Sequence, residues 1–420
     1  MTQTQNIVVL GGGFAGLEAA FLARERLGER ARITLVSDRD EFLFKPNTIY
    51  IPFGADPASL LIPLAKPAAK QGIGFVKGVV EGVDPARGTA HVSGGVLPWD
   101  YLVIATGAGM APEEVPGLSE HAETIWTPAE MASLGERLRA LVEDAKRGAR
   151  RRILFLVPPN NKCAGPLYEM VFMTETWLRR QGVRDRFELV YTTYEPTFIA
   201  AFGPKLHEVV VSEFAARGIE GHTDWRVSAV EAEAVAYENG ERVAYDLLVA
   251  FPPYVAALRY DGLPADERGF LETELGSRRV RGHERIFAPG DAGDFPVKQA
   301  FLAFLQADAV VGHIAADVQG RDPELVFTPV SMCVMEQFDK ATFAQVPLAL
   351  TGDPLQPVAV RADADGAYRV GVSPLWRLGK KVLGLYLNFR FRAGRPFHAG
   401  APWKAMEVGL KGMSTILARR

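Results

Sequence analysis

A strand, a glycine-rich turn and a helix follow one another near the N-terminus. Residues 7–17 read Ile7-Val8-Val9-Leu10-Gly11-Gly12-Gly13-Phe14-Ala15-Gly16-Leu17. Four apolar residues predict a buried strand, and apolar periodicity predicts a helix over residues 17–27. The Gly-x-Gly-x-x-Gly spacing between them, with a further apolar strand at residues 33–36, is typical of a dinucleotide-binding βαβ unit.

Each glycine of this turn has a separate physical role. Gly11 permits the tight turn, Gly13 lets the backbone approach a pyrophosphate, and Gly16 allows the helix to pack closely on the strand. Phe14 and Ala15 lie in the same turn, before the helix whose N-terminus stabilises phosphate charge. We therefore assign these five residues to cofactor binding.

The end of the second strand is the expected site of ribose recognition, usually by an acidic residue. Ser37 holds that position here and Asp38 follows it. Both are candidates for the ribose hydroxyls; the alternative for Asp38 is a side chain that faces solvent.

Two further segments favour a flavin over a nicotinamide at this first site. One is an apolar strand that ends in Ala105-Thr106-Gly107, and the other is a strand that ends in Gly290-Asp291. Asp291 is placed to bind a ribityl chain, and the helix after it directs its N-terminus at the flavin. Together with the first glycine turn, these segments predict bound FAD.

A second α/β unit lies between these segments. Its predicted elements are a helix at 128–147, a strand at 152–157, a helix at 167–181, a strand at 187–191, a helix at 205–217 and strands up to residue 249. The turn after the first strand reads Pro158-Pro159-Asn160-Asn161-Lys162-Cys163-Ala164-Gly165. A thiol stands where a second nucleotide-binding turn carries glycines, which argues against NADH at this site.

The predicted fold is α/β, with two Rossmann-like domains, the second inserted in the first, and a C-terminal amphipathic helical region that binds a membrane surface. The expected boundaries are 1–111 and 256–325 for the FAD domain, 112–255 for the inserted domain and 326–420 for the C-terminal region. No metal ligands are assigned.

Composition and charge limit the classes of partner. The chain has 420 residues, 48% of them hydrophobic, and a net charge of −3, which does not fit a nucleic-acid-binding protein. From residue 377 onward it has ten Lys or Arg and one acid, a charge of +9, so the remainder carries −12. A basic end on an acidic body predicts contact with an anionic membrane surface. With no visible signal peptide and no run of 18 apolar residues, we expect a peripheral protein on the cytoplasmic face of the membrane.

The sequence also resembles a known family, the sulfide:quinone oxidoreductases, which are related to the flavoprotein subunit of flavocytochrome c sulfide dehydrogenase and to type II NADH dehydrogenases. The resemblance covers nearly the whole chain. It includes Phe42-Leu43-Phe44-Lys45-Pro46, similar to a flavin-contacting loop, and two cysteine motifs, Cys163-Ala164-Gly165-Pro166-Leu167-Tyr168-Glu169 and Ser331-Met332-Cys333-Val334-Met335. It implies that Lys45 and Pro46 contact the flavin and that Cys163 and Cys333 form a redox pair.

Two departures from the family pattern limit this comparison. Many members have a third cysteine before the helix that starts near Pro128, where this chain has Ile125-Trp126-Thr127. A mechanism or a covalent flavin link that needs a third thiol is thereby excluded. Some members have a histidine after the Glu195-Pro196 turn, and this chain has none there, which weakens the expectation of quinone binding.

The resemblance implies a thiol mechanism. Hydrosulfide opens a bridge between Cys163 and Cys333, one cysteine becomes a persulfide and the other a thiolate, and two electrons pass to the flavin. Lys162 would favour the thiolate, Glu169 would act as the general base, and Lys298 would stabilise negative charge on the reduced flavin. The alternatives are a solvated or helix-capping Glu169, an exposed Lys298 and an inert buried thiol at Cys333.

The C-terminal region carries an apolar stripe at alternating spacings of three and four. It consists of Trp403, Met406, Leu410, Met413 and Leu417, with Lys404 and Lys411 beside it. An interfacial helix with its apolar face among lipid chains has this pattern; the alternative is a stripe packed on the protein's own core or on a second copy in a homo-oligomer. Membrane contact implies a quinone acceptor, with Phe338 and Phe343 as candidate lining residues; the alternative for both is ordinary packing in the core.

We therefore expect an FAD-dependent enzyme that oxidises sulfide through Cys163 and Cys333 and passes electrons to a membrane quinone. Three alternatives stay open. One is an NADH:quinone oxidoreductase, the second is a sulfide dehydrogenase that passes electrons to a cytochrome subunit, and the third is a non-catalytic flavin-bearing sulfide sensor or adaptor.

Overall fold

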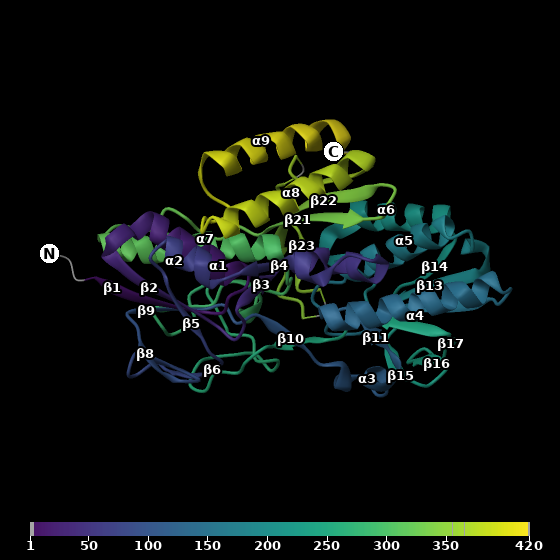
Figure 1. Ribbon diagram of the computed structural model, residues 1–420, viewed down its shortest axis with the longest axis horizontal. Helices are drawn as coiled ribbons and strands as arrows, with labels where there is room; N and C mark the ends of the chain where they lie inside the picture. The colour runs from purple at the N-terminus through teal and green to yellow at the C-terminus, as the bar shows by residue number, and fades with distance from the viewer. Residues whose placement is uncertain (1–3, 355, 365, 419–420) are drawn as a thin grey trace.

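Two parallel five-stranded sheets form the body of the protein, and a smaller antiparallel sheet with two helices lies over them (Figure 1). The computed structural model describes residues 4–354, 356–364 and 366–418. The predicted α/β fold class is confirmed.

The first sheet follows from the short apolar runs read in the sequence. Its strand order is β20 (Ile286–Phe287), β9 (Tyr101–Ile104), β1 (Gln5–Leu10), β2 (Ala31–Ser37) and β5 (Gly74–Lys77), all parallel. Helices α1 (Phe14–Leu27) and α7 (Ala300–Gln319) pack together on one face. Because parallel strands end at a common edge, the glycine turn after β1 and the Thr106-Gly107 turn after β9 lie next to each other.

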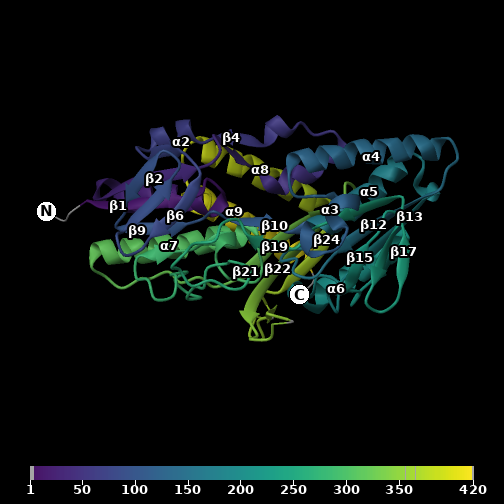
Figure 2. The same ribbon diagram turned by 90° about the horizontal axis from the view of Figure 1, so that it is seen from below.

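The second sheet matches the predicted inserted unit to within two residues at most element ends. Its order is β11 (Glu123–Thr124), β18 (Leu247–Ala250), β12 (Arg151–Val157), β13 (Phe187–Thr193) and β14 (Ile219–His222). It is covered by α4 (Pro128–Lys146), α5 (Gly165–Arg180) and α6 (Gly203–Arg217), all visible in Figure 2. Helix α4 begins at a capping box in which the Thr127 side chain and Glu130 satisfy each other's backbone N–H groups.

The chain passes between the two sheets at two neighbouring points. Strand β10 (Ala108–Met110) follows the first sheet and pairs antiparallel with β19 (Tyr254–Ala256), which follows the second. The outgoing and returning crossings therefore lie side by side, as an inserted unit requires. The residue boundaries predicted for the domains remain predictions.

The remaining elements are smaller. The C-terminal sheet contains β21 (Val330–Glu336), β22 (Ala341–Leu350), β23 (Val358–Val360) and β24 (Arg369–Ser373), followed by α8 (Pro374–Arg392) and α9 (Gly400–Leu417). The others are β3 (Glu41–Leu43), β4 (Leu61–Pro63), α2 (Ala65–Lys70), β6 (Val80–Asp84), β7 (Thr89–Val92), β8 (Gly95–Pro98), α3 (Leu118–His121), β15 (Val227–Val230), β16 (Ala234–Tyr237) and β17 (Arg242–Ala244).

The predicted orientation of the stripe on α9 is wrong. Trp403 is buried, Met406 and Leu410 pack with it, and Met413 and Leu417 pack against the cluster around Trp376. The stripe thus covers the protein's own core, because aromatic side chains of α8 and β22 offer it apolar surface. The outward positions of α9 are different residues, with Val408 and Ile416 71% and 82% exposed.

One helix within the described residues is long and apolar enough to cross a bilayer. This is α7, whose apolar window has a mean hydropathy of 1.4. However, 67% of that window is buried inside the protein, and α7 packs along α1. Burial of this kind is expected of a core helix.

The glycine turn supplies a test of the fold. An added Cβ on Gly16 would overlap the carbonyl oxygen of Gly11, whereas one on Gly13 would meet no atom within 4 Å. We expect Gly16→Ala to lower the free energy of unfolding by about 1–3 kcal/mol through overpacking. The matched variant Gly13→Ala should change it by less than about 0.5 kcal/mol. Urea unfolding of the cofactor-free proteins compares the two, and equal stability would contradict the packing role of Gly16.

Candidate active site

A cavity of about 640 Å³ opens at the carboxyl ends of the strands of the first sheet. Its wall brings together the three segments that the sequence analysis singled out and both cysteine segments. Of the predicted cofactor-binding residues, it includes Gly11, Gly13, Phe14, Ala15, Ser37, Asp38, Lys45, Pro46, Ala105, Thr106, Gly107, Gly290, Asp291 and Lys298. Gly16 does not line it and instead packs under the turn against Gly11.

The glycine turn leaves room for a phosphate group. Gly11 has a φ of 115°, which favours glycine, and its N–H donates to the carbonyl of Val36 at 2.8 Å. The position that a Cβ of Gly13 would occupy is open and lies at the cavity. The first turn of α1 lies beside that space, so its free N–H groups suit a pyrophosphate. These residues fit the predicted dinucleotide.

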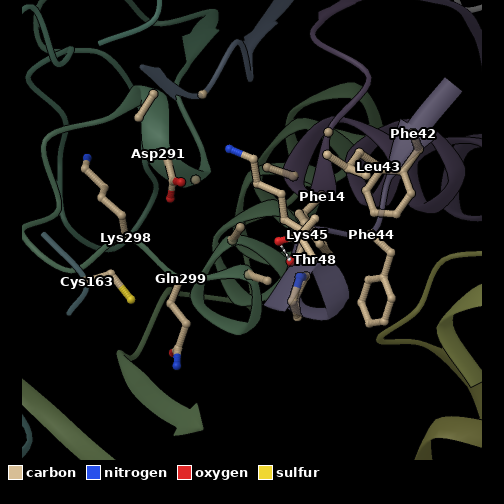
Figure 3. Close-up of a pocket in the computed structure, with 18 of the residues that line it drawn as sticks. Phe14, Phe42, Leu43, Phe44, Lys45, Thr48, Cys163, Asp291, Lys298 and Gln299 are labelled. Carbon is tan, nitrogen blue, oxygen red and sulfur yellow. Dashed lines mark hydrogen bonds between the residues drawn. The ribbon is translucent and has the colours of Figure 1, made fainter. Parts of the chain in front are cut away.

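Charged side chains of opposite sign meet in this cavity. Figure 3 shows Cys163, Asp291 and Lys298 on one side and Lys45 with the phenyl rings of Phe14, Phe42 and Phe44 on the other. Burial raises the pKa of Asp291, although the charges of Lys298 and Lys45 oppose this shift. The carboxylate is thus placed among cations at the position predicted to hold a ribityl chain.

Two lysines of the cavity, Lys45 and Lys298, have lowered pKa values. Burial lowers the pKa of Lys298 to about 7 and that of Lys45 to about 7 as well. Lys298 is 3% exposed, donates to the carbonyl of Gly293 and lies 3.8 Å from the centre of the Phe270 ring. The alternative of an exposed Lys298 is therefore wrong.

The two cysteines line the same cavity although 170 residues separate them in the sequence. Cys163 lies in the turn between β12 and α5, and Cys333 lies in β21. Both are free thiols and partly exposed to the cavity. Burial raises the pKa of each thiol, that of Cys333 to about 12, and a charge on Cys333 raises the pKa of Cys163 further. The expected lowering by Lys162 is wrong, because loss of solvation dominates.

Asn161 fixes the cysteine turn and was not recognised from the sequence. Its side-chain oxygen Oδ1 accepts from the N–H of Cys163 at 2.9 Å, and its side-chain nitrogen Nδ2 donates to the carbonyls of Phe251 at 2.9 Å and Pro252 at 3.2 Å. The turn is thereby tied to the segment that returns to the first sheet. The Asn160-Asn161 pair was the available signal, since asparagine side chains close such turns.

Glu169 is neither solvated nor a cap. It is 6% exposed, forms an ion pair with Lys380 of α8, and accepts from the N–H of Glu336 at 2.7 Å. Burial raises its pKa, and the charge of Lys380 opposes that shift. A buried carboxyl group with a raised pKa beside the Cys333 strand is suited to general base chemistry.

A second buried carboxylate completes this cluster. Glu336 is fully buried, accepts from the Tyr50 hydroxyl at 2.7 Å, and pairs with Arg377 at 2.6 Å. Sequence reasoning missed Glu336, Arg377 and Lys380 because their partners are distant in the chain. Phe338 lies beside a smaller 440 Å³ pocket with Tyr50 and Lys380, whereas Phe343 is stacked on Trp376 at 4.1 Å in the core and is not a lining residue.

Comparisons with known proteins find similar chains. Residues 5–142 match the pyridine nucleotide-disulphide oxidoreductase family. The sulfide-quinone reductase of Aquifex aeolicus is 30% identical over 241 residues, which cover 56% of this chain and 54% of that protein. The chain is thus similar in sequence to sulfide:quinone oxidoreductases. The resemblance inferred from the cysteine motifs is thereby confirmed.

Other matches extend the comparison. The crystal structure of the sulfide:quinone oxidoreductase from Aquifex aeolicus superimposes with a TM-score of 0.84 at 23% identity, covering 97% of this chain and 96% of that one. An NADH dehydrogenase-like protein of Mycobacterium tuberculosis is 27% identical over 296 residues, covering 68% of this chain and 72% of that protein. The matched family consists of oxidoreductases, in agreement with the predicted enzyme class.

Burial of Lys298 predicts a pH dependence of stability. In the unfolded chain its pKa returns to about 10.4, so between pH 7 and 10 the unfolded state binds more protons than the folded state. The stability of the wild type relative to Lys298→Met should therefore rise with pH across this window. Thermal unfolding of the cofactor-free proteins at pH 7, 8.5 and 10 measures the difference. The exposed Lys66→Met is the matched control, and a pH-independent difference for Lys298→Met would contradict the assignment.

Proposed function

We propose that this protein is an FAD-dependent enzyme that oxidises sulfide through Cys163 and Cys333 and delivers the electrons to a membrane quinone. The observation that carries the proposal is the meeting of both thiols with the glycine turn and Asp291 in one cavity. The sequence alignment with the Aquifex aeolicus sulfide-quinone reductase spans about half of that protein, 54%. The activity therefore rests on the site as well as on the relatives.

Different residues would bind different parts of the cofactor. The glycine turn and α1 would hold the pyrophosphate, Ser37 and Asp38 the ribose, and Asp291 the ribityl chain. Bound flavin supplies a two-electron acceptor beside the thiols and a donor to the quinone. Lys298 and Lys45, which already oppose the raised pKa of Asp291, would offset negative charge added to the cavity.

Sulfide chemistry at the cysteines is thiol exchange. Hydrosulfide attacks the bridged pair: a new S–S bond forms on one cysteine, the bond between the cysteines breaks, and its electron pair leaves on the other as a thiolate. Loss of two electrons and one proton from this persulfide and thiolate forms a bridge with one extra sulfur. Glu169 accepts the proton. The net reaction consumes hydrosulfide, quinone and one proton and yields zero-valent sulfur and quinol.

Helix α8 connects this cavity to the protein exterior. Lys380, Leu383, Gly384 and Leu387 line the cavity. On the opposite face, exposed apolar side chains recur at spacings of three and four; they are Leu375, Leu378, Val382, Leu385 and Phe389. With the exposed Lys381 and Arg392 beside them, they form a surface suited to the boundary of anionic lipids. A lipid-soluble quinone would thus reach the cavity along α8.

The thiol pair has a direct test. Sulfide added anaerobically to the purified flavoprotein should bleach the flavin absorbance, and NADH should not. Cys163→Ala and Cys333→Ala should each slow the sulfide-driven bleaching by at least about 100-fold, since exchange needs both sulfurs. Dithionite bleaching of each variant controls for an intact flavin site. Bleaching by NADH, or unchanged rates in the double variant, would contradict the proposal.

The outer face of α8 has its own test. Burial of a Leu or Phe side chain contributes about 1.5–3 kcal/mol, so Leu385→Glu with Phe389→Glu should lower partitioning onto vesicles of anionic lipid by at least tenfold. Sedimentation with vesicles measures it. Val326→Glu, at an apolar residue 61% exposed outside the C-terminal helices, is the control and should bind as the wild type does. Equal binding of both variants would place the membrane contact elsewhere.

A further inference from the structure

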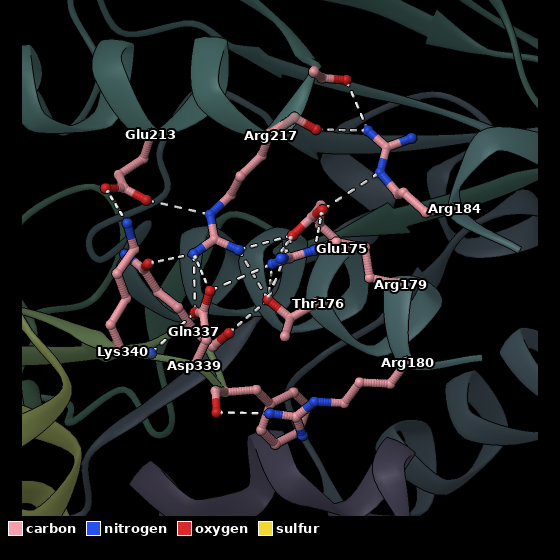
Figure 4. Close-up of polar contacts among 12 residues, drawn as sticks. Glu175, Thr176, Arg179, Arg180, Arg184, Glu213, Arg217, Gln337, Asp339 and Lys340 are labelled. Carbon is pink, nitrogen blue, oxygen red and sulfur yellow. Dashed lines mark hydrogen bonds and ion pairs between the residues drawn. The ribbon is translucent and has the colours of Figure 1, made fainter. Parts of the chain in front are cut away.

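Arg217, the last residue of α6, is the centre of a buried polar network (Figure 4). Its side chain is 5% exposed. Nη1 donates to Glu175 Oε2 at 2.7 Å and Thr176 Oγ1 at 2.8 Å, and Nε donates to Glu213 Oε2 at 3.2 Å. Nη2 donates to Gln337 Oε1 at 2.8 Å and to Asp339 Oδ1 at 2.9 Å. All five N–H groups of the guanidinium therefore have an oxygen partner.

Arg217 joins side chains of α5, the helix that follows Cys163, to side chains of the turn that follows β21, the strand that contains Cys333. Glu175 and Thr176 lie in α5, which begins two residues after Cys163. Gln337 and Asp339 form the turn between β21, which carries Cys333, and β22. The resemblance to the sulfide:quinone oxidoreductases gives no role to this network. The network lies outside the cavity that both thiols line.

Further contacts connect the Gln337–Lys340 turn to helices α5 and α6. Thr176 Oγ1 donates to the carbonyl of Gln337 at 2.7 Å, and Arg180 donates to the carbonyl of Phe338 at 2.9 Å. Lys340 pairs with Glu213 at 2.7 Å. Phe338 itself has a φ of 69°, a left-handed conformation that costs energy for a bulky residue and persists because these contacts impose it.

This arrangement controls where Cys333 lies along α5. Side chains of a strand alternate between its two faces, so a slip of β21 by one residue would turn Cys333 away from Cys163. A slip also needs the Gln337–Lys340 turn to move. Gln337 and Asp339 would then leave Nη2 of Arg217, and this buried nitrogen would lose both partners while the contacts of Nη1 and Nε with α5 and α6 remain. Because breaking a buried ion pair costs far more than breaking an exposed one, the network opposes the slip.

We propose that Arg217 is a positioning residue that holds the Cys333 strand in register with the Cys163 helix and so sets how readily the two sulfurs bond. The inference rests on the thiol pair of the proposed function. It predicts that Arg217 affects the equilibrium between the two thiols and their disulfide without touching either sulfur. Lysine cannot replace it fully, since an ammonium has three donors and no planar fork.

The test is equilibration of the full-length protein with reduced and oxidised glutathione. In this exchange two glutathione thiols reduce one protein disulfide and become glutathione disulfide, and free protein thiols are then counted by alkylation and mass. Arg217→Met should lower the equilibrium constant for the Cys163–Cys333 disulfide at least tenfold, or about 30 mV for a two-electron couple. Arg217→Lys should fall between Arg217→Met and the wild type.

Arg151→Met is the matched control. Arg151 is an ion-paired arginine of the same unit that bonds Asp144 at 2.7 Å and Asp246 at 3.2 Å, and neither partner contacts Arg217 or the Gln337–Lys340 turn. It should lower the melting temperature but leave the equilibrium constant within about twofold, as expected of a change outside the coupled network. If Arg217→Met does not fold, Thr176→Val and Asp339→Asn replace it, each with a decrease of at least threefold expected.

The outcomes separate this inference from the proposed function. A wild-type protein that forms no disulfide between the two cysteines overturns the thiol pair and with it the role of Arg217. A wild-type disulfide whose equilibrium constant is unchanged by Arg217→Met, or by both replacement variants, overturns the positioning role alone. An equal decrease in Arg151→Met also overturns it, because the effect would then be general destabilisation.

Discussion

Loss of solvation inside one cavity governs the chemistry that this protein can perform. Burial is the first cause of every resolved pKa shift among the cavity's ionisable groups: the acids Asp291 and Glu169, the thiols and Lys45 and Lys298 all move toward their neutral forms. A buried charge is costly unless a partner is present. The protonation of this site should therefore change when a charged ligand enters, because a negative charge on the ligand would favour the protonated form of the lysines.

The cavity itself depends on contacts between distant segments. Asn161 ties the Cys163 turn to the returning crossing at Phe251, and Gln299 at the start of α7 holds β21 through the carbonyl of Met332 and the hydroxyl of Ser331. Glu169 and Arg217 hold the same strand farther along. Each contact is polar and directional, so it specifies register, which apolar packing alone does not.

Sequence reasoning succeeded where the determinant is local. The glycine turn, the Thr106-Gly107 and Gly290-Asp291 turns and the alternating strands and helices could all be predicted, since each depends on neighbouring residues. It failed for Lys380, Glu336 and Arg217, whose roles exist only once α8, β21 and α6 meet. The stripe on α9 shows the same limit: periodicity identifies an apolar face but does not distinguish lipid from the ring of Trp376 or Trp403 as its partner.

The two faces of helix α8 have different surroundings, the cavity on one side and the protein exterior on the other. Its inner residues Lys380 and Gly384 line the cavity, and an added Cβ at Gly384 would lie 3.1 Å from the ring of Phe44. Its outer residues Leu385 and Phe389 are 72% and 69% exposed. Helix α8 thus has one face at the cavity and the opposite, apolar face at the protein exterior. Because the α9 stripe packs on the body beside it, α8 is held in place by the core and stays free on its outer face.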